Sequence, residues 1–538
     1  MLIGYVSDEM HVALSDVLVE FRNGSEVFET RSSASGAVRA ELPAGLWQTV
    51  VAKLNFGRKT IQIEVKVGMS PIQIRMLSDR LLGYAWPKWA QAGDKVELRV
   101  HSPEPYFASL WRYGLDKVHV ADIGRFESFG PGGDCQVLPD CDFTVTGVQW
   151  NHYGRRFPPN TRAYITAPAK SGLYYVHLEG ERSRGFFNFP LIVAPREPVA
   201  RIAVLASNIN WNAYNDFGGR SNYVGAGRLE VEPVVNPHQD GAFLRDTGAR
   251  FWDREDYDPI SFDRPEPVNR VEREAKVADI MGRIGEEHVA PATWRLLGWL
   301  EREGFAYDLW SETQLHTNTL QLDHYKVLVL DQHPEYWSRN MYYALKAWVF
   351  ERSGRLMYLG GNGLNCEVEF VNDSAVVHRN TDLSEWLPTR SYEGGPGSAV
   401  PSRMSKRVEN EACLLGVSTT MTGMGTAAPF KVVDSDHWCY AGTSLQVGDL
   451  FGEESLDARN PGGASGHETD KINSFSPTGT RLLAKGVNPF GGGSEMVSFE
   501  TPAGGEVFST GSISWITSLL VSDKISRITA NVLHRFTR

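Results

Sequence analysis

The chain of 538 residues lacks several features that would place it in a class at once. Its five cysteines are odd in number and scattered, so a disulfide framework is not expected. No apolar run approaches the ~20 residues that cross a bilayer, and the first residues do not read as a signal peptide. A net charge of −11, without a basic stretch interleaved with aromatics, argues against nucleic acid or an anionic membrane as partner. We therefore expect a soluble, cytoplasmic protein.

The short motifs of common enzyme classes are missing too. The sequence has no HExxH and no paired CxxC for zinc, no P-loop, no GxGxxG between a strand and a helix, and no GxSxG elbow. It does have 42% hydrophobic and 11% aromatic residues, which is enough for well-packed globular domains. At this length we expect more than one core.

The first 197 residues predict two β-sandwich modules. Residues 1–80 contain short strands separated by Gly and Ser, and they resemble a transthyretin-like or carboxypeptidase-regulatory-like module. Residues 81–197 continue with alternating and aromatic-rich strands, which favour an immunoglobulin-like sandwich.

From residue 198 the pattern changes to alternating strands and helices. Residues 202–206, 326–330 and 356–359 read as short apolar strands, and residues 342–352 as a helix ended by a glycine. Such alternation implies a mostly parallel sheet with right-handed crossovers. We predict a glutamine-amidotransferase-like or flavodoxin-like α/β catalytic domain over residues 198–538.

Polar residues follow two of these strands. His333 and Glu335 come directly after residues 326–330, and Tyr214 and Asn215 lie in a polar, aromatic loop predicted after residues 202–206. Open α/β sheets present their chemistry at the carboxyl ends of their strands, so we expect these side chains on one rim. Each also has a structural reading: His333 could cap a helix, and Glu335 could favour a helix N-terminus.

Asn362 follows Gly360 and Gly361 at the end of a third strand. Two glycines would let the backbone approach a ligand closely and turn the Asn362 amide inward; a plain turn is the alternative. Cys366 is the rival nucleophile, since glutamine-amidotransferase-like domains place a cysteine after a strand. It lies several residues beyond the strand end, which favours an inert thiol.

Two later segments add titratable groups, each of which could also be an ordinary loop residue. The candidates are His437, His467, Glu468 and Asp470.

Taken together, these motifs resemble the N,N-dimethylformamidase large (beta) subunit family. The resemblance covers approximately residues 81–538, in matching order, and leaves residues 1–80 outside it. The shared pieces are AYNDFGGRSNY at 213–223, SFDRP at 261–265, HPEYW at 333–337, GGN at 360–362, DHW at 436–438 and GHETD at 466–470.

The resemblance implies amide hydrolysis at a mononuclear iron, expected to be ferric, held by two tyrosinates and one glutamate. By position Glu335 is the carboxylate and Tyr214 the first phenolate. Tyr257 is our choice for the second, with Tyr223 as the alternative. Phenolates and carboxylates are hard oxygen donors that suit such a cation. Since tyrosine titrates near pH 10, the metal itself must hold it deprotonated.

By the same resemblance His333, Asn362 and Glu468 surround the metal. His333 or Asn362 could donate to the developing oxyanion, and Glu468 could take a proton from water and pass it to the departing amine. A small N-alkyl amide would suit an aromatic pocket, for which the candidates are Trp211, Phe217 and Trp337.

The expected function is an iron-dependent amidohydrolase acting on a formamide or a related small N-substituted amide. A homo-oligomer is expected, and the family's separate small subunit leaves an accessory partner open. Two alternatives remain. One is a Cys366-dependent, amidotransferase-like hydrolase, and the other is a non-catalytic binding protein whose α/β domain has lost its chemistry.

Overall fold

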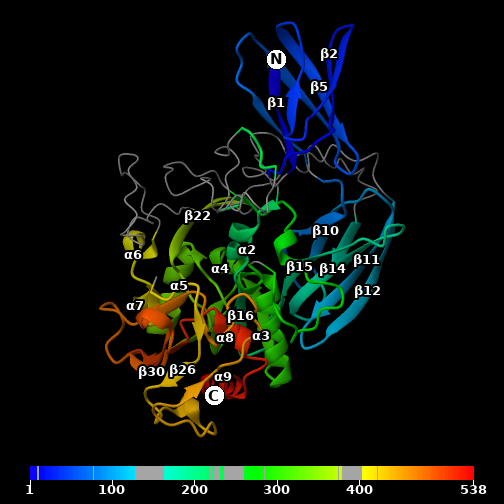
Figure 1. Cartoon of the computed structure of the whole chain (residues 1–538). Helices are drawn as coiled ribbons and strands as arrows, with labels where there is room; N and C mark the ends of the chain where they lie inside the picture. Colours follow the sequence, from blue (N-terminus) through cyan, green and yellow to red (C-terminus); the bar gives the residue numbers. More distant parts are fainter. Residues whose placement is uncertain are drawn as a thin grey trace.

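The computed structural model describes residues 1–8, 11–76, 78–127, 163–217, 221–222, 231–235, 260–283, 285–372, 375–378, 403–420 and 422–538. In these segments no helix is long and apolar enough to cross a membrane. Figure 1 shows a β-rich N-terminal module at the top, a second β-rich region beside β15, and a larger mixed region that ends at the C-terminus.

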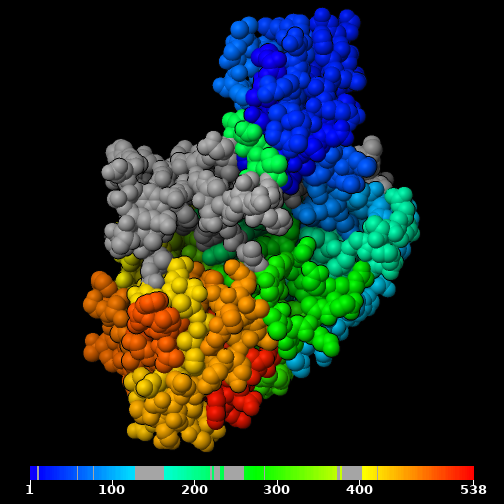
Figure 2. Space-filling view, in the orientation of Figure 1, coloured from blue at the N-terminus to red at the C-terminus, as the bar shows by residue number. Residues whose placement is uncertain are grey.

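The N-terminal module consists of two small sheets, ordered β4-β1-β7 and β3-β2-β5-β6. Its strands are β1 (Leu2–Asp8), β2 (Leu18–Asn23), β3 (Glu26–Arg31), β4 (Ala37–Arg39), β5 (Gly45–Lys53), β6 (Gly57–Val65) and β7 (Ile72–Met76). Fully buried side chains such as Phe21 and Trp47 form its core. The module stands out from the rest of the surface in Figure 2, with residues 231–235 beside it, where Val12 bridges Val234.

The second sandwich has sheets ordered β13-β10-β8 and β12-β11-β14-β15-β9. Its strands are β8 (Leu82–Trp86), β9 (Trp89–Gln91), β10 (Lys95–His101), β11 (Tyr106–Tyr113), β12 (Lys117–Phe126), β13 (Ala163–Thr166), β14 (Gly172–Gly180) and β15 (Phe186–Ala194). The strands of both sandwiches fall in the expected parts of the chain, while boundaries at residues 80 and 197 stay predictions.

A nine-stranded sheet ordered β18-β16-β19-β21-β32-β31-β30-β26-β27 organises the rest. Its first five strands are mutually parallel and its last four pairings antiparallel. The strands are β16 (Ile202–Ala206), β18 (Tyr307–Ser311), β19 (Val327–Leu330), β21 (Arg355–Tyr358), β26 (Phe430–Val432), β27 (Leu450–Phe451), β30 (Arg481–Gly486), β31 (Glu495–Glu500) and β32 (Glu506–Ser509). A mixed α/β region is thus confirmed; the closer assignment to an amidotransferase-like or flavodoxin-like fold stays a prediction.

Helices cover both faces of the parallel strands (Figure 1). On β19, Val327 and Val329 join the cluster of α3 (Ala290–Arg302), α8 (Ser514–Ser518) and α9 (Asp523–Phe536). Leu328 and Leu330 join the cluster of α4 (Glu312–His316) and α5 (Arg339–Glu351). Because successive side chains of a strand alternate between faces, burial on both sides requires the uninterrupted apolar run seen in the sequence.

The composition of the polar segment after β16 predicted a loop. This prediction is wrong, because the segment begins with helix α2 (Asn208–Tyr214). Neighbouring carboxylates satisfy donors at its start: Ser207 N donates to Asp331 Oδ2 at 3.2 Å and Ile209 N to Glu312 Oε2 at 3.1 Å. Free N–H groups at a helix start need such acceptors. The partners come from distant strand ends, so local sequence could not indicate this helix.

Short elements complete the described chain. They are β17 (Ile260–Ser261), η5 (Pro267–Asn269), η6 (Glu286–His288), η7 (Leu322–His324), β20 (Tyr336–Trp337), β22 (Cys366–Asn372), β23 (Ala375–His378), α6 (Met404–Arg407), α7 (Ala412–Leu415), β24 (Ser418–Thr420), β25 (Ala427–Ala428), η9 (Trp438–Tyr440), β28 (Ser465–Gly466), β29 (Thr469–Lys471) and η10 (Pro489–Gly491).

Candidate functional site

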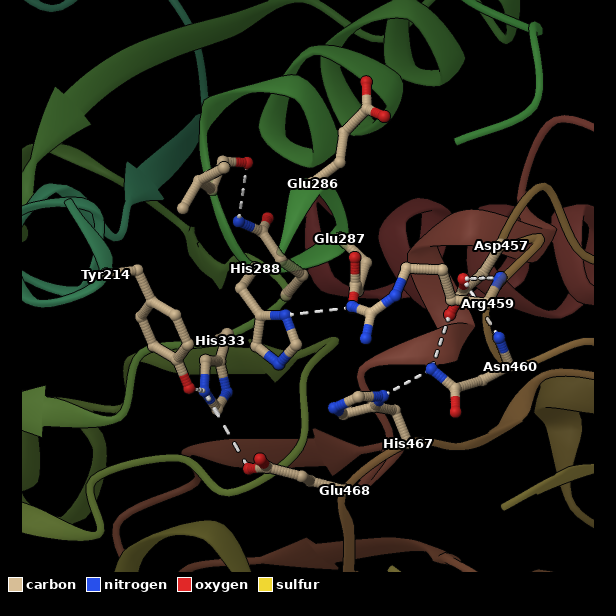
Figure 3. Close-up of polar contacts among 12 residues, drawn as sticks. Tyr214, Glu286, Glu287, His288, His333, Asp457, Arg459, Asn460, His467 and Glu468 are labelled. Carbon is tan, nitrogen blue, oxygen red and sulfur yellow. Dashed lines mark hydrogen bonds and ion pairs between the residues drawn. The ribbon is translucent and has the colours of Figure 1, made fainter. Parts of the chain in front are cut away.

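Four segments meet at the carboxyl edge of the parallel strands. Tyr214 ends α2 after β16, His333 and Glu335 follow β19, Asn362 follows β21, and Glu468 lies between β28 and β29. Direct polar contacts join their side chains, and Figure 3 shows Tyr214, His333 and Glu468 pointing toward one another. The expectation that Tyr214, His333 and Glu335 share one rim is confirmed.

Tyr214 and Glu335 bring two oxygen donors together. The Tyr214 hydroxyl donates to Glu335 Oε2 at 3.4 Å and lies 3.2 Å from His333 Nε2. Oxygens that bind one cation at about 2 Å each lie roughly 3 Å apart, so the pair is close to the spacing of a chelating set.

Asn362 holds the other oxygen of this carboxylate. Its Nδ2 donates to Glu335 Oε1 at 3.1 Å, and its own Oδ1 accepts from Thr419 Oγ1 at 2.6 Å. The backbone N–H of Asn362 donates to Asp470 Oδ1 at 2.8 Å. The residue adopts a left-handed φ of 53°, a conformation that asparagine tolerates better than most residues. These contacts fix the amide with its nitrogen toward Glu335.

The two glycines before Asn362 have a different role from the expected one. An ideal Cβ on Gly360 would lie 2.5 Å from Gln332 O, and one on Gly361 would lie 2.3 Å from Glu468 O. The space is therefore taken by the chain's own backbone and not by a ligand. This close approach brings the segment that carries Glu468 against the end of β21.

His333 and Glu468 form a buried acid–base pair. His333 Nδ1 donates to Gly361 O at 3.0 Å, and its Nε2 lies 3.1 Å from Glu335 Oε2 and 3.8 Å from Glu468 Oε2. Burial lowers the pKa of His333, but the two carboxylates outweigh it and raise this pKa to about 9. Burial raises the pKa of Glu468 to about 7 against the attraction of His333.

His288 lies beside these residues, although the sequence analysis did not select it. Its ring stacks on Tyr214 with centroids 5.0 Å apart and lies edge-on to His333 at 4.7 Å (Figure 3). It comes from η6, a turn before α3, and not from the end of a strand. The sole local signal is the run of titratable residues at 286–288.

The other sequence candidates lie in varied places. His467 is edge-on to His288 at 4.7 Å, and Asp470 Oδ1 supports Asn362 by accepting from its backbone N–H. His437 caps η9 beside Trp438, where burial lowers its pKa to about 4, and no described contact joins it to the group. Cys366 starts β22 with 1% exposure and donates its backbone N–H to Glu335 O at 3.0 Å, so it supports the site from within a strand.

Two further expectations have different outcomes. Tyr257 and Tyr223, the candidates for the second phenolate, lie outside the described residues. The expectation of one aromatic pocket is wrong, because the three rings are buried in three separate hydrophobic clusters. These rings are Trp211, Trp337 and Phe217.

Comparisons with known proteins agree with the resemblance of the motifs. The family described as N,N-dimethylformamidase beta subunit-like, C-terminal, matches residues 133–527. The N,N-dimethylformamidase beta subunits of an Alcaligenes species and of Paracoccus aminophilus are 26% and 25% identical over 515 residues, which cover 80% of this chain. The chain spans 63% of the length of these relatives.

Among solved structures, a DUF3823 family protein from Bacteroides ovatus aligns with 36% of this chain and 98% of its own. At a TM-score of 0.13 and 11% identity that likeness carries no weight. The family match covers most of the chain and includes every segment that meets at the carboxyl edge of the sheet. The chain therefore belongs to the N,N-dimethylformamidase beta subunit-like family.

Proposed function

We propose that this protein is an amide hydrolase that uses one ferric iron ion to cleave a formamide or a related small N-substituted amide. The observation that carries the proposal is the 3.4 Å contact between the Tyr214 hydroxyl and Glu335 Oε2, at the sheet edge where α/β proteins place their chemistry. The membership of the family and the names of its relatives support the reaction.

The donor set fits a hard, highly charged cation. A phenol and a carboxylate offer oxygen atoms, and two buried carboxylates, Glu335 and Glu468, concentrate negative charge around them. Glu468 Oε2 has no hydrogen-bond partner among the described residues, as expected where a further group completes the site. Tyr214 and Glu335 would hold the ion together with a second tyrosine, for which we retain Tyr257, with Tyr223 as the alternative.

When bound, such an ion supplies Lewis-acid polarisation of the amide carbonyl and acidifies water. Hydrolysis also needs a proton to move from water to the departing nitrogen while the C–N bond breaks. Glu468 suits that task, because burial raises its pKa to about 7, near the pH at which it must both accept and return a proton.

His333 and Asn362 orient the remaining groups. His333 carries a proton on Nδ1, which donates to Gly361 O, and its Nε2 faces the carboxylates, where an N–H could donate to the developing oxyanion. Asn362 donates to Glu335 Oε1 and so directs Oε2 toward Tyr214. Held by these contacts, the acceptors and donors need little rearrangement during the reaction.

The relatives are named as beta subunits. We include in the proposal that this chain works in an oligomer, with an accessory subunit as a partner to be sought. Size-exclusion chromatography with light scattering, with and without co-expressed candidate subunits, measures this directly.

Elemental analysis of the purified protein with an absorption spectrum tests the function. We expect about one iron per chain, a visible phenolate-to-iron band, and release of amine from N,N-dimethylformamide or another small formamide. Glu335→Gln should lose both iron and band. Glu453→Gln, which alters an exposed carboxylate, is the matched control and should keep them. An active preparation that is colourless and free of iron would refute the proposal.

A further inference from the structure

His288 contacts helix α2 at two points one turn apart. Asn210 Nδ2 donates to the His288 carbonyl at 2.9 Å, and the His288 ring stacks on Tyr214 at a centroid distance of 5.0 Å and an interplanar angle of 24°. Residues four apart on a helix share a face, so both contacts fall on the same side of α2. His288 therefore contacts this face of α2 both through its carbonyl and through its ring.

Glu287 lies beside the His288 ring and is itself paired with Arg459. His288 Nδ1 lies 3.3 Å from Glu287 Oε1, and Arg459 Nη1 lies 3.0 Å from the same oxygen (Figure 3). The Glu287 side chain is 1% exposed, and the backbone N–H of Arg459 donates to Asp457 Oδ1 at 2.9 Å. A buried carboxylate persists only with partners that compensate its charge, so the position of Glu287 is strongly determined.

We propose that His288 is a positioning residue for Tyr214. Its stacked ring, which lies beside the Glu287–Arg459 pair, sets the phenol plane so that the hydroxyl faces Glu335. The inference rests on the proposed function in one respect, namely that Tyr214 donates its phenolate to the metal. The stacking geometry itself does not depend on that role.

The contact predicts a measurable loss on truncation. An aromatic pair contributes beyond its buried area by an amount that corresponds to about a two- to tenfold change in an equilibrium constant. His288→Ala should therefore weaken ferric iron binding by about two- to tenfold. His288→Phe keeps a ring against Tyr214 and should restore most of the affinity. Glu287→Gln leaves the ring in place but loosens it, and should fall between the two.

The matched control is His177→Ala. His177 stacks on Trp111 at the same centroid distance of 5.0 Å, but in the second sandwich. His177→Ala removes the same type of contact at a remote position, so this substitution should leave the iron affinity unchanged. Thermal unfolding of each variant identifies any that fails to fold.

The test has two readouts. The first is a titration of each variant with ferric iron against a competing chelator, followed by the phenolate band. The second is ¹⁹F NMR of metal-free protein labelled with 3-fluorotyrosine, in which Tyr214→Phe identifies the resonance of Tyr214. His288→Ala should move and broaden that resonance, because the ring current and the fixed ring plane are lost, while His288→Phe should keep it near its parent position.

An unchanged Tyr214 resonance in folded His288→Ala overturns the proposal, as does failure of His288→Phe to rescue either readout. If the parent protein binds no iron, the proposed function fails. The fluorine spectra of the metal-free proteins still decide whether His288 positions Tyr214, so the two failures are distinguishable.

Discussion

Replacement of Arg264 by methionine should loosen the end of helix α2 and thereby the Tyr214 ring. Arg264 is fully buried in the SFDRP turn and donates from Nη2 to Asn212 O at 3.1 Å and Asn215 O at 2.9 Å, and from Nη1 to Phe217 O at 3.2 Å. The last carbonyls of a helix lack donors from the next turn, so this guanidinium supplies donors at the end of α2.

The structure gives the size of the effect. In Arg264→Met the carbonyls of Asn215 and Phe217 lose this donor, and each buried acceptor left unpaired costs about 1–3 kcal/mol. The sum is about 2–6 kcal/mol, and entry of water favours the lower end. An opening free energy lower by about 2 kcal/mol corresponds to roughly 30-fold faster local exchange.

Hydrogen–deuterium exchange of peptides that cover residues 208–217 measures this opening without requiring the whole chain to unfold in two states. Arg302→Met is the matched control, because Arg302 donates to Leu520 O at 2.9 Å and Leu519 O at 3.0 Å after α8 and should affect only that region. Unchanged protection of residues 208–217 in Arg264→Met would show that the reasoning is wrong.

Three other changes give separate tests. Asn362→Ala removes the donor to Glu335 Oε1 and should weaken iron binding by about 10–100-fold in the chelator titration; an unchanged affinity contradicts the geometry. Cys366→Ala should leave turnover near that of the parent, whereas a cysteine nucleophile would require its complete loss. Burial raises the pKa of Asp331 from 3.8 to about 6, so the folded protein binds this proton more tightly than the unfolded chain does. The resulting stabilisation is fully present below pH 4, and about 3 kcal/mol of it is lost as the pH rises to 6. Asp331→Asn cannot ionise, so its melting temperature relative to the parent should rise between pH 4 and 6, and a flat difference would contradict the assignment.

Much of the site could be predicted from strand ends alone. Tyr214, His333 and Glu335 follow short apolar runs, and parallel strands deliver such residues to one edge because every strand points the same way. Their contacts at 3.1–3.4 Å confirm that logic. Glu468 follows no strand of this sheet, and only the family resemblance predicted that it belongs to the site.

What could not be predicted depends on contacts between distant segments. Helix α2 begins where Glu312 Oε2 accepts from Ile209 N–H, and nothing local marks that acceptor. His288 lies in a short turn whose position is set by the Asn210 amide and by Glu287. The glycines of the GGN motif serve close packing of backbone against backbone, which a sequence pattern cannot distinguish from approach to a ligand.

The SFDRP turn that carries Arg264 is itself held by the second sandwich. Asp263 accepts from the Tyr84 hydroxyl at 2.6 Å and is paired with Arg99. Three residues later, Glu266 Oε1 lies 2.6 Å from Lys88 Nζ, and both side chains are buried. Buried ion pairs of this kind are weak evidence for added stability, but loss of one partner leaves an uncompensated charge and is strongly destabilising.

The second sandwich is thus part of the support of the site. Within one turn, Asp263 contacts Tyr84 on β8, Glu266 contacts Lys88 between β8 and β9, and Arg264 contacts the end of α2. A shift of the sandwich must move this turn, and through Arg264 the carbonyls on either side of Tyr214.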